Sequence, residues 1–219
     1  MGMLEKIKSY FGPVTLKTVQ SQFNGPLDLV MLEGKILLDS KHTNYSYGSL
    51  ERVLEFGIKR CNLQSAKQAL ILGLGAGSVL RPLTKQLGKE LKIDAVEIDP
   101  VLIQLAKDEY GILESSALTI HQKDASKLDF LNNAMFDFVL IDLFIDTKIP
   151  EFVFEKSFWV ELCNHLSPHA TLVFNGGLLM EDKQRSRELA IQLDKEFDIQ
   201  LYDKVEGFNL VLCMKKKNA

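Results

Sequence analysis

The sequence predicts an α/β protein in which helices cover a mostly parallel sheet, preceded by a small β-structured appendage. From residue 51 onward, apolar runs alternate with segments of helical periodicity. These runs are continuously apolar, which is typical of parallel strands buried on both faces. Residues 1–50 instead contain short β-prone segments separated by the turn signals "NGP" at 24–26 and "EG" at 33–34. We therefore expect an appendage over 1–50 and a main domain over 51–219.

The expected elements of the main domain follow in order. Strands are expected at 68–73, 93–99, 117–122, 136–143, 170–175, 198–204 and 208–214, and helices at 49–60, 78–90, 100–110, 151–166 and 180–196. Only "VEG" at 205–207 joins the last two strands, which is too short for a helical crossover. Those two strands should therefore pair antiparallel.

The composition of the chain indicates which binding partners and which cellular compartment are expected. A formal net charge of −3 and a pI near 5.9 favour neither nucleic acid nor an anionic membrane as partner. The chain shows no secretory signal and no apolar stretch of membrane-spanning length, so we expect a cytoplasmic protein. Three distant cysteines without a CxxC pair fit a reducing compartment. No metal site is expected, because a proline separates His165 from His169.

The segment "LGLGAGS" at 72–78 stands where the first buried strand gives way to a helix. Gly73 and Gly75 allow a sharp turn and a close approach of the backbone to a ligand, while Gly77 leaves room for the following helix. Ala76 is assigned to the same ligand-binding loop. The pattern indicates a nucleoside-like ligand. Dinucleotide binding is an alternative, although the GxGxG spacing and the terminal hairpin fit it less well.

Acidic residues end the next strands. Glu97 lies about twenty residues after the loop, where a carboxylate can accept hydrogen bonds from both ribose hydroxyls, and we assign its neighbour Ile98 to the same site. Asp99 precedes Pro100 and is expected to cap the helix over 100–110. Asp124 could contact a purine amino group, with Ala125 offering a backbone amide, or it could form an Asx turn.

The fourth strand of the main domain, "FDFVLIDL", ends with Asp142 at the edge where open α/β sheets place their chemistry. A carboxylate there could anchor a substrate ammonium group or take its proton. Asp146, four residues further on, is a second candidate, with simple solvation as the alternative. Asp137 starts the same strand, away from this edge, and is assigned no function.

Taken together, "LGLGAGS", "VEID", "KDA" and "VLID" resemble the motifs of the class I S-adenosylmethionine-dependent methyltransferases over residues 68–214. This resemblance implies a Rossmann-like, seven-stranded, mostly parallel sheet with an antiparallel C-terminal hairpin. It also implies S-adenosylmethionine as the cofactor, with Gly73, Gly75, Ala76, Gly77, Glu97, Ile98, Asp124 and Ala125 at its site.

A narrower resemblance is to the spermidine synthases, the polyamine aminopropyltransferases, which place a small β-domain before this fold. The segment "GPLDLVMLEGKILLDSKHTNYSYGSL" is similar to their hairpin and tyrosine motif. On that resemblance Tyr47 orients the attacking amine and Asp142 takes its proton, decarboxylated S-adenosylmethionine is the donor, and the protein is a homodimer. The family's glycine loop reads GGGDGG, however, and its aspartate corresponds here to Ala76.

Three functions are therefore compared. The first is methyl transfer to a small-molecule acceptor, with Asp142 and Tyr47 as the catalytic residues. The second is aminopropyl transfer from decarboxylated S-adenosylmethionine. The third is a non-catalytic module that binds the nucleoside ligand. Besides the loop aspartate, the polar or acidic residues that follow the family's tyrosine are replaced here, by Gly48 and Ser49. Because polyamines carry several positive charges, the loss of these family carboxylates favours the first function.

Overall fold

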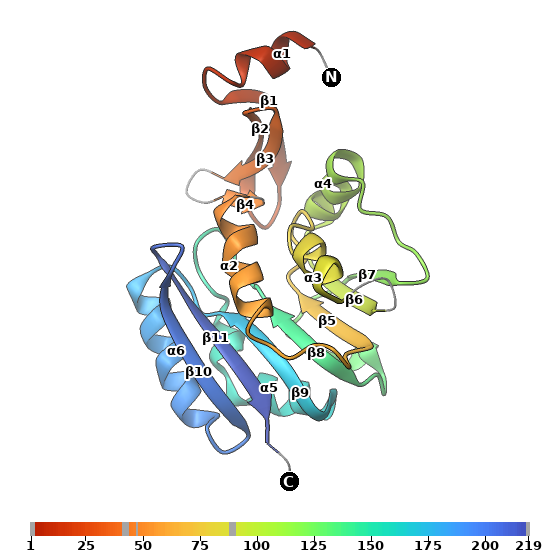
Figure 1. Cartoon of the computed structure of the whole chain (residues 1–219), viewed down its shortest axis with the longest axis vertical. Coiled ribbons are helices and arrows are strands. Elements are labelled where there is room, and N and C mark those ends of the chain that lie inside the picture. The colour runs from red at the N-terminus through yellow and green to blue at the C-terminus, as the bar shows by residue number, and fades with distance from the viewer. Residues whose placement is uncertain (1–2, 41–43, 47, 88–90, 218–219) are drawn as a thin grey trace.

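The computed structural model describes residues 3–40, 44–46, 48–87 and 91–217. Two sheets organise these residues, and Figure 1 shows the smaller sheet above one edge of the larger. The smaller sheet has the order β1-β2-β3-β4 and the larger one β10-β11-β9-β8-β5-β6-β7.

Each neighbouring pair from β7 to β9 in the larger sheet is parallel, and β11 pairs antiparallel with both β9 and β10. The predicted seven-stranded, mostly parallel sheet with an antiparallel C-terminal hairpin is thus confirmed. Its strands are β5 (Gln68–Leu72), β6 (Lys92–Glu97), β7 (Leu118–Gln122), β8 (Phe136–Ile141), β9 (Leu166–Asn175), β10 (Phe197–Val205) and β11 (Asn209–Lys216).

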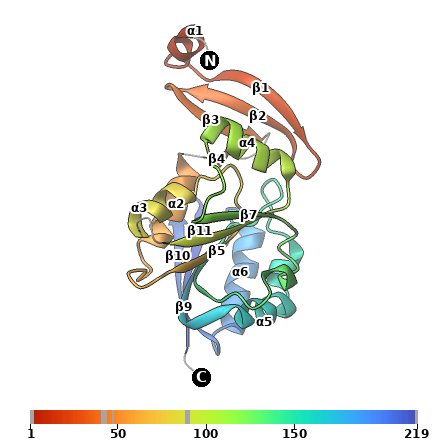
Figure 2. The same ribbon diagram turned by 90° about the vertical axis from the view of Figure 1, so that its right-hand side faces the viewer.

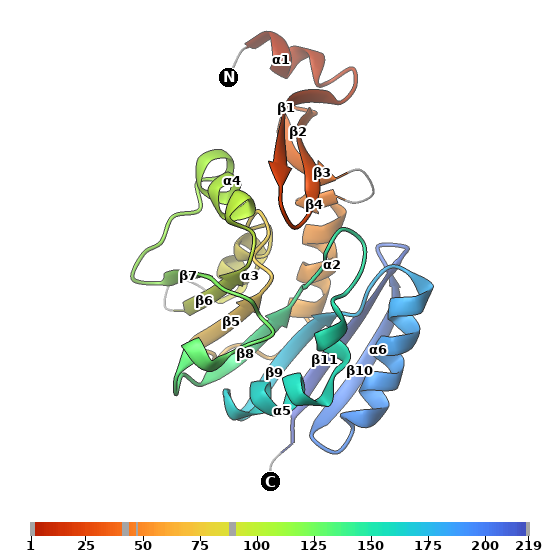
Figure 3. The same cartoon turned by 180° about the vertical axis from the view of Figure 1, so that it is seen from behind.

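Helices cover both faces of this sheet, as the continuously apolar strands require. Leu70 and Leu72 belong to one core cluster, whereas Ala69 and Ile71 between them belong to another, because side chains alternate across a strand. Figures 1 and 3 show these faces from opposite sides. The helices on the first face are α5 (Lys156–Asn164) and α6 (Met180–Gln192), and those on the second are α2 (Ser49–Ile58) and α3 (Leu80–Leu87).

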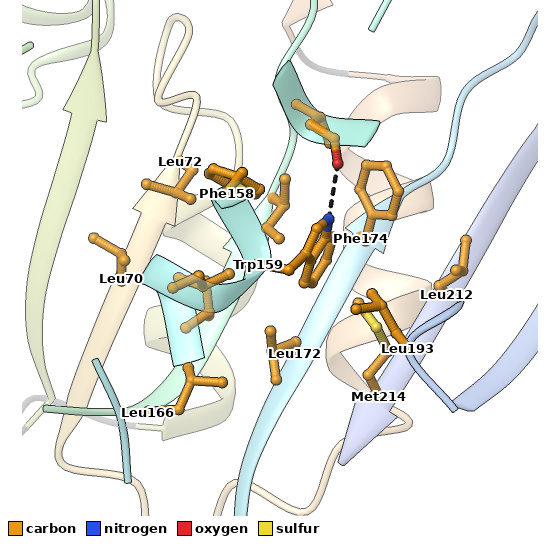
Figure 4. Packing of buried hydrophobic residues seen from close by; sticks show 14 of the residues in the cluster. Leu70, Leu72, Phe158, Trp159, Leu166, Leu172, Phe174, Leu193, Leu212 and Met214 are labelled. Carbon is orange, nitrogen blue, oxygen red and sulfur yellow. Dashed lines mark hydrogen bonds between the residues drawn. The ribbon is translucent and has the colours of Figure 1, made fainter. Parts of the chain in front are cut away.

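The sequence predicts one helix over residues 151–166, but the structure divides this segment. A 3-10 turn, η2 (Glu151–Phe154), precedes α5, and Glu155 between them has an extended backbone. The indole N–H of Trp159 donates to the carbonyl of Val153 at 2.8 Å, which folds the turn back onto the helix (Figure 4). Trp159 also packs edge-on against Phe158 and Phe174. The predicted continuous helix is therefore wrong, because the chain bends at Glu155 and the turn before it packs on Trp159.

The N-terminal segment forms the predicted β-appendage as an antiparallel four-stranded sheet. It follows a short helix, α1 (Met3–Lys8), and consists of β1 (Val14–Ser21), β2 (Gly25–Leu32), β3 (Lys35–Ser40) and β4 (Asn44–Ser46). Helix α4 (Pro100–Tyr110) lies beneath this sheet (Figure 2), and their apolar side chains form a third core cluster.

The side chain of Asp99 connects the end of β6 and the start of α4 with the smaller sheet through hydrogen bonds. As predicted, its carboxylate caps α4, accepting from the N–H of Val101 at 2.9 Å, with Pro100 in the first turn. Its other oxygen accepts from the hydroxyl of Ser21 and from the side-chain amide of Asn24, at 2.8 Å. Asp99 is completely buried. One carboxylate therefore holds both the start of α4 and the β1–β2 turn.

We expect Asp99→Ala to lower the free energy of unfolding by about 2–4 kcal/mol, because it removes a helix cap and leaves buried donors without an acceptor. Urea unfolding followed by circular dichroism measures this change. Asp198→Ala is the control, since Asp198 is exposed and its ion pair with Lys217 spans 3.6 Å. A variant within 0.5 kcal/mol of wild type at Asp99, on the order of a surface change, would refute this role.

None of the helices formed by the described residues is long and apolar enough to cross a lipid bilayer. Among the same residues, no group of three or more His, Cys, Asp or Glu side chains is arranged to hold a metal ion.

Candidate active site

A cavity of about 380 Å³ opens at the carboxyl edge of the parallel strands. Its walls come from residues that end or follow β5, β6, β7, β8 and β9, and from the start of β11. Phe23, in the turn between β1 and β2, and Leu50, on α2, complete it. Strands β6 and β8 flank β5 on opposite sides, so the cavity lies where the strand order reverses. Open α/β sheets bind their ligands at this place, and the volume suits a nucleoside-sized ligand.

The glycine loop forms the floor of the cavity. Gly73 has a φ of +91°, and a Cβ there would lie 2.2 Å from the carbonyl oxygen of Asp142. The N–H groups of Gly73 and Leu74 both donate to the carbonyl of Val96, at 3.0 and 3.1 Å. Only glycine allows β5, β6 and β8 to meet this closely. Because Gly73 and Gly75 carry no side chain, the backbone of the loop can also approach a ligand in the cavity.

Glu97 binds this loop directly. Its carboxylate accepts from the N–H of Gly75 at 2.8 Å and from the N–H of Asp99 at 3.0 Å. Only 7% of the residue is exposed. Burial raises the pKa of Glu97, and the backbone hydrogen bonds oppose that rise. The carboxylate is therefore held in one orientation beside the cavity, with acceptor capacity left for hydroxyl groups.

The remaining predicted ligand residues divide into two groups. Ile98, Asp124 and Ala125 line the cavity together with Gly73, Gly75 and Glu97. Asp124 also accepts from the N–H of Ser126 at 2.8 Å, so the Asx turn is present and the residue still lies at the cavity wall.

Ala76 and Gly77 lie in the loop but do not line the cavity. Ala76 is fully buried in the third core cluster, which contains Leu27 and Leu29 of the small sheet. A Cβ on Gly77 would meet the side chain of Ile112 at 2.8 Å. The side-chain positions of these two residues therefore serve the packing of the loop.

Asp142 lies across the cavity floor from Glu97 and takes part in a chain of side-chain amides. Asn175, at the end of β9, donates to the carboxylate of Asp142 at 2.9 Å. Asn209, at the start of β11, donates to the side-chain carbonyl of Asn175 at 3.0 Å. All three line the cavity. Burial raises the pKa of Asp142 to about 6, and the hydrogen bond from Asn175 opposes this rise.

Sequence reasoning did not identify either asparagine. Each interrupts an apolar run at its cavity end, "LVFN" in β9 and "NLVL" in β11, and this interruption is the available signal. Asp146 also lines the cavity, from a turn between Ile145 and Lys148. Tyr47, the other predicted catalytic residue, lies outside the described residues.

Comparison with known proteins agrees with this geometry. A family profile described as "Methyltransferase domain" matches residues 69–168. The spermidine synthase of Thermotoga maritima superposes with a TM-score of 0.71 at 14% identity, covering 93% of this chain and 73% of that one. Human methyltransferase-like protein 13, solved with SAH, superposes with a TM-score of 0.61 at 22% identity, covering 78% and 83% of the two chains. The fold is that of the class I S-adenosylmethionine-dependent methyltransferases, in a spermidine synthase-like form.

A curated relative, the polyamine aminopropyltransferase of Vibrio vulnificus, is 37% identical over 112 residues. These residues make up 50% of this chain and 37% of that protein, so the chain matches little more than a third of the relative's length. These comparisons establish a spermidine synthase-like methyltransferase fold.

Proposed function

We propose that the protein transfers a methyl group from S-adenosylmethionine to a small-molecule acceptor, with Asp142 orienting or deprotonating the acceptor nucleophile. The observation that carries this proposal is the placement of Asp142 and Glu97 on either side of one glycine loop, in one cavity. Glu97 offers a fixed carboxylate to ribose hydroxyls, and the hydrogen bond from Asn175 fixes the orientation of the Asp142 carboxylate.

The residues present fit the adenosine part of such a donor. A Cβ at Gly73 would fill the space between the loop and Asp142. Glu97 ends β6, and the exposed Asp124 follows the neighbouring strand β7, so hydroxyl and amino groups of an adenosine would meet acceptors on one side of the cavity. Ile98, which is 36% exposed, offers an apolar surface between them.

When bound, the donor supplies an electrophilic carbon on a sulfonium, whose bond to sulfur breaks as the acceptor's bond to carbon forms, leaving a thioether. The chain then has to hold the acceptor in line and receive its proton. Asn175 occupies one oxygen of Asp142 and leaves the other for the acceptor. Positioning of this kind can supply about 7–11 kcal/mol of the barrier reduction.

Ala76 favours methyl transfer over aminopropyl transfer. In the aminopropyltransferases, the aspartate at this loop position faces the free amino group of the donor. Here the residue is an alanine, buried against the small sheet and α4. The usual carboxylate contact for a decarboxylated donor is therefore missing from this loop.

Aminopropyl transfer is the second candidate, because the Vibrio vulnificus relative is named a polyamine aminopropyltransferase. Calorimetric titration with S-adenosylhomocysteine and methylthioadenosine separates the two reactions, since these products differ in the amino-acid tail. We expect S-adenosylhomocysteine to bind more tightly. Tighter binding of methylthioadenosine would favour aminopropyl transfer, and binding of neither would indicate a fold without donor binding.

The role of Asn175 yields a prediction about pH. Because its amide stabilises the ionised form of Asp142, Asn175→Leu should raise the pKa of Asp142 further above about 6. A base must be ionised to accept a proton, so the acidic limb of the kcat profile should move to higher pH. Asn209→Leu leaves the hydrogen bond from Asn175 to Asp142 in place and removes the amide that orients Asn175, so it should give a smaller shift in the same direction. An unchanged profile in Asn175→Leu would exclude this positioning role.

A further inference from the structure

The acceptor half of the cavity has a different chemistry from the donor half. The strand order places the ends of β7, β6 and β5 on one side and those of β8, β9 and β11 on the other. Glu97, Asp124 and Lys123 line the first side, where the adenosine would lie. The second side, with Asp142, is left to the acceptor.

Apolar side chains make most of the acceptor side. Phe144 and Phe152 line the cavity and also pack against the core cluster that contains Trp159. Phe152 meets the core residue Phe158 edge-on, with ring centroids 5.3 Å apart. Pro150 and Leu178 extend this surface. We call Phe144, Pro150, Phe152 and Leu178 the apolar wall. Because its aromatic rings are fixed by the core, the wall is a preformed surface for an apolar ligand.

The charges on the acceptor side are few and of one sign. Among the described lining residues, the acidic ones on this side are Asp142 and Asp146, and Lys123, the only basic one, lies on the donor side. An anionic acceptor would therefore meet two carboxylates and no cationic side chain among the described lining residues of this side. A neutral alcohol would give Asp142 a hydrogen bond in addition to that from Asn175, but no positive charge to offset the buried carboxylate.

A polyamine also fits this side poorly. Asp142 offsets the charge of one ammonium group of the acceptor. A second ammonium group would lie against the apolar wall, where its desolvation has no compensating partner. The charges and the apolar surface of this side therefore both disfavour a polyamine as the acceptor.

From these features we infer that the acceptor is a monoamine with an apolar, aromatic-sized body. This inference rests on the proposed methyl transfer. The body packs on Phe152 and Leu178, and the ammonium group pairs with Asp142. In the reaction, one ammonium proton passes to Asp142, the nitrogen lone pair forms the bond to the methyl carbon, and the electrons of the carbon–sulfur bond remain on sulfur.

The test is a calorimetric panel of three acceptor probes with saturating S-adenosylhomocysteine: 2-phenylethylamine, putrescine and p-cresol. We expect 2-phenylethylamine to bind at least tenfold more tightly than either of the others. Putrescine binding as tightly as 2-phenylethylamine would overturn the apolar wall as the specificity element. Tighter binding of p-cresol would overturn the assignment of an amine, and binding of none at millimolar concentration would overturn the inference as a whole.

Two variants make the test specific to the wall. Phe152→Ala should weaken 2-phenylethylamine about tenfold or more, the order of effect for losing an aromatic contact. Leu178→Asp adds a third carboxylate and should improve putrescine binding while weakening 2-phenylethylamine, a gain that misfolding cannot imitate. Ile191→Ala, on the exposed face of α6, is the control and should change neither affinity. An unchanged preference in Leu178→Asp would contradict the inference.

The donor titration is a separate readout. If S-adenosylhomocysteine does not bind, the proposed function fails, and the panel is repeated with the protein alone. A preference for 2-phenylethylamine that depends on Leu178 would then still support the monoamine site, and its absence would overturn it.

Discussion

Asp142→Asn is expected to lower kcat about 100- to 10,000-fold, because the amide cannot accept the acceptor's proton. The affinity for S-adenosylhomocysteine should stay close to that of the wild type, since the adenosine contacts lie on Glu97 and the glycine loop. The measurement is the transfer of a labelled methyl group to the amine that binds most tightly, together with calorimetry of the product.

Asp137→Asn is a matched control on the same strand. Asp137 starts β8, and its carboxylate accepts from the backbone N–H groups of Lys67 and Gln68 at the opposite end of the sheet. The amide oxygen of asparagine can still accept these bonds, so turnover should be unchanged. If Asp142→Asn kept more than half of the wild-type kcat, Asp142 would not be the proton acceptor.

Glu97→Ala is expected to weaken S-adenosylhomocysteine binding by about 10- to 1,000-fold, the value of one or two hydrogen bonds to a charged group. The substitution also removes the acceptor for the N–H groups of Gly75 and Asp99, so the loop should lose stability. Calorimetric titration measures the affinity, and thermal unfolding shows whether the variant is folded at the temperature of the titration.

Glu97→Gln separates these two effects, because it keeps one acceptor oxygen for the loop but loses the charge. We expect an affinity between those of the wild type and Glu97→Ala, with a smaller change in Tm. Wild-type affinity in a folded Glu97→Ala would mean that adenosine does not lie against this carboxylate.

Much of the larger sheet could be predicted because its strands are buried on both faces and leave continuous apolar runs in the sequence. The same pattern identifies the residues at the strand ends, and Glu97, Asp124 and Asp142 do line one cavity. The cap role of Asp99 also follows from a local signal, an acidic residue before a proline.

Contacts between distant segments could not be predicted in this way. Asn175 and Asn209 become neighbours only through the antiparallel pairing of β9 with β11, in which Asn175 lies opposite Val211. Phe23 reaches the cavity because Ser21 and Asn24 bind Asp99, a contact across two sheets. Ala76 differs from its loop neighbours because the small sheet covers it, and the loop sequence alone does not show which positions face the ligand.

The most direct measurement is a crystal structure of the protein with S-adenosylhomocysteine. We expect the ribose hydroxyls to bind the carboxylate of Glu97, the adenine to lie against Ile98, and the sulfur to face Asp142. An adenosine bound elsewhere, or a sulfur turned away from Asp142, would contradict both the donor site and the assignment of Asp142 as the group that receives the acceptor's proton.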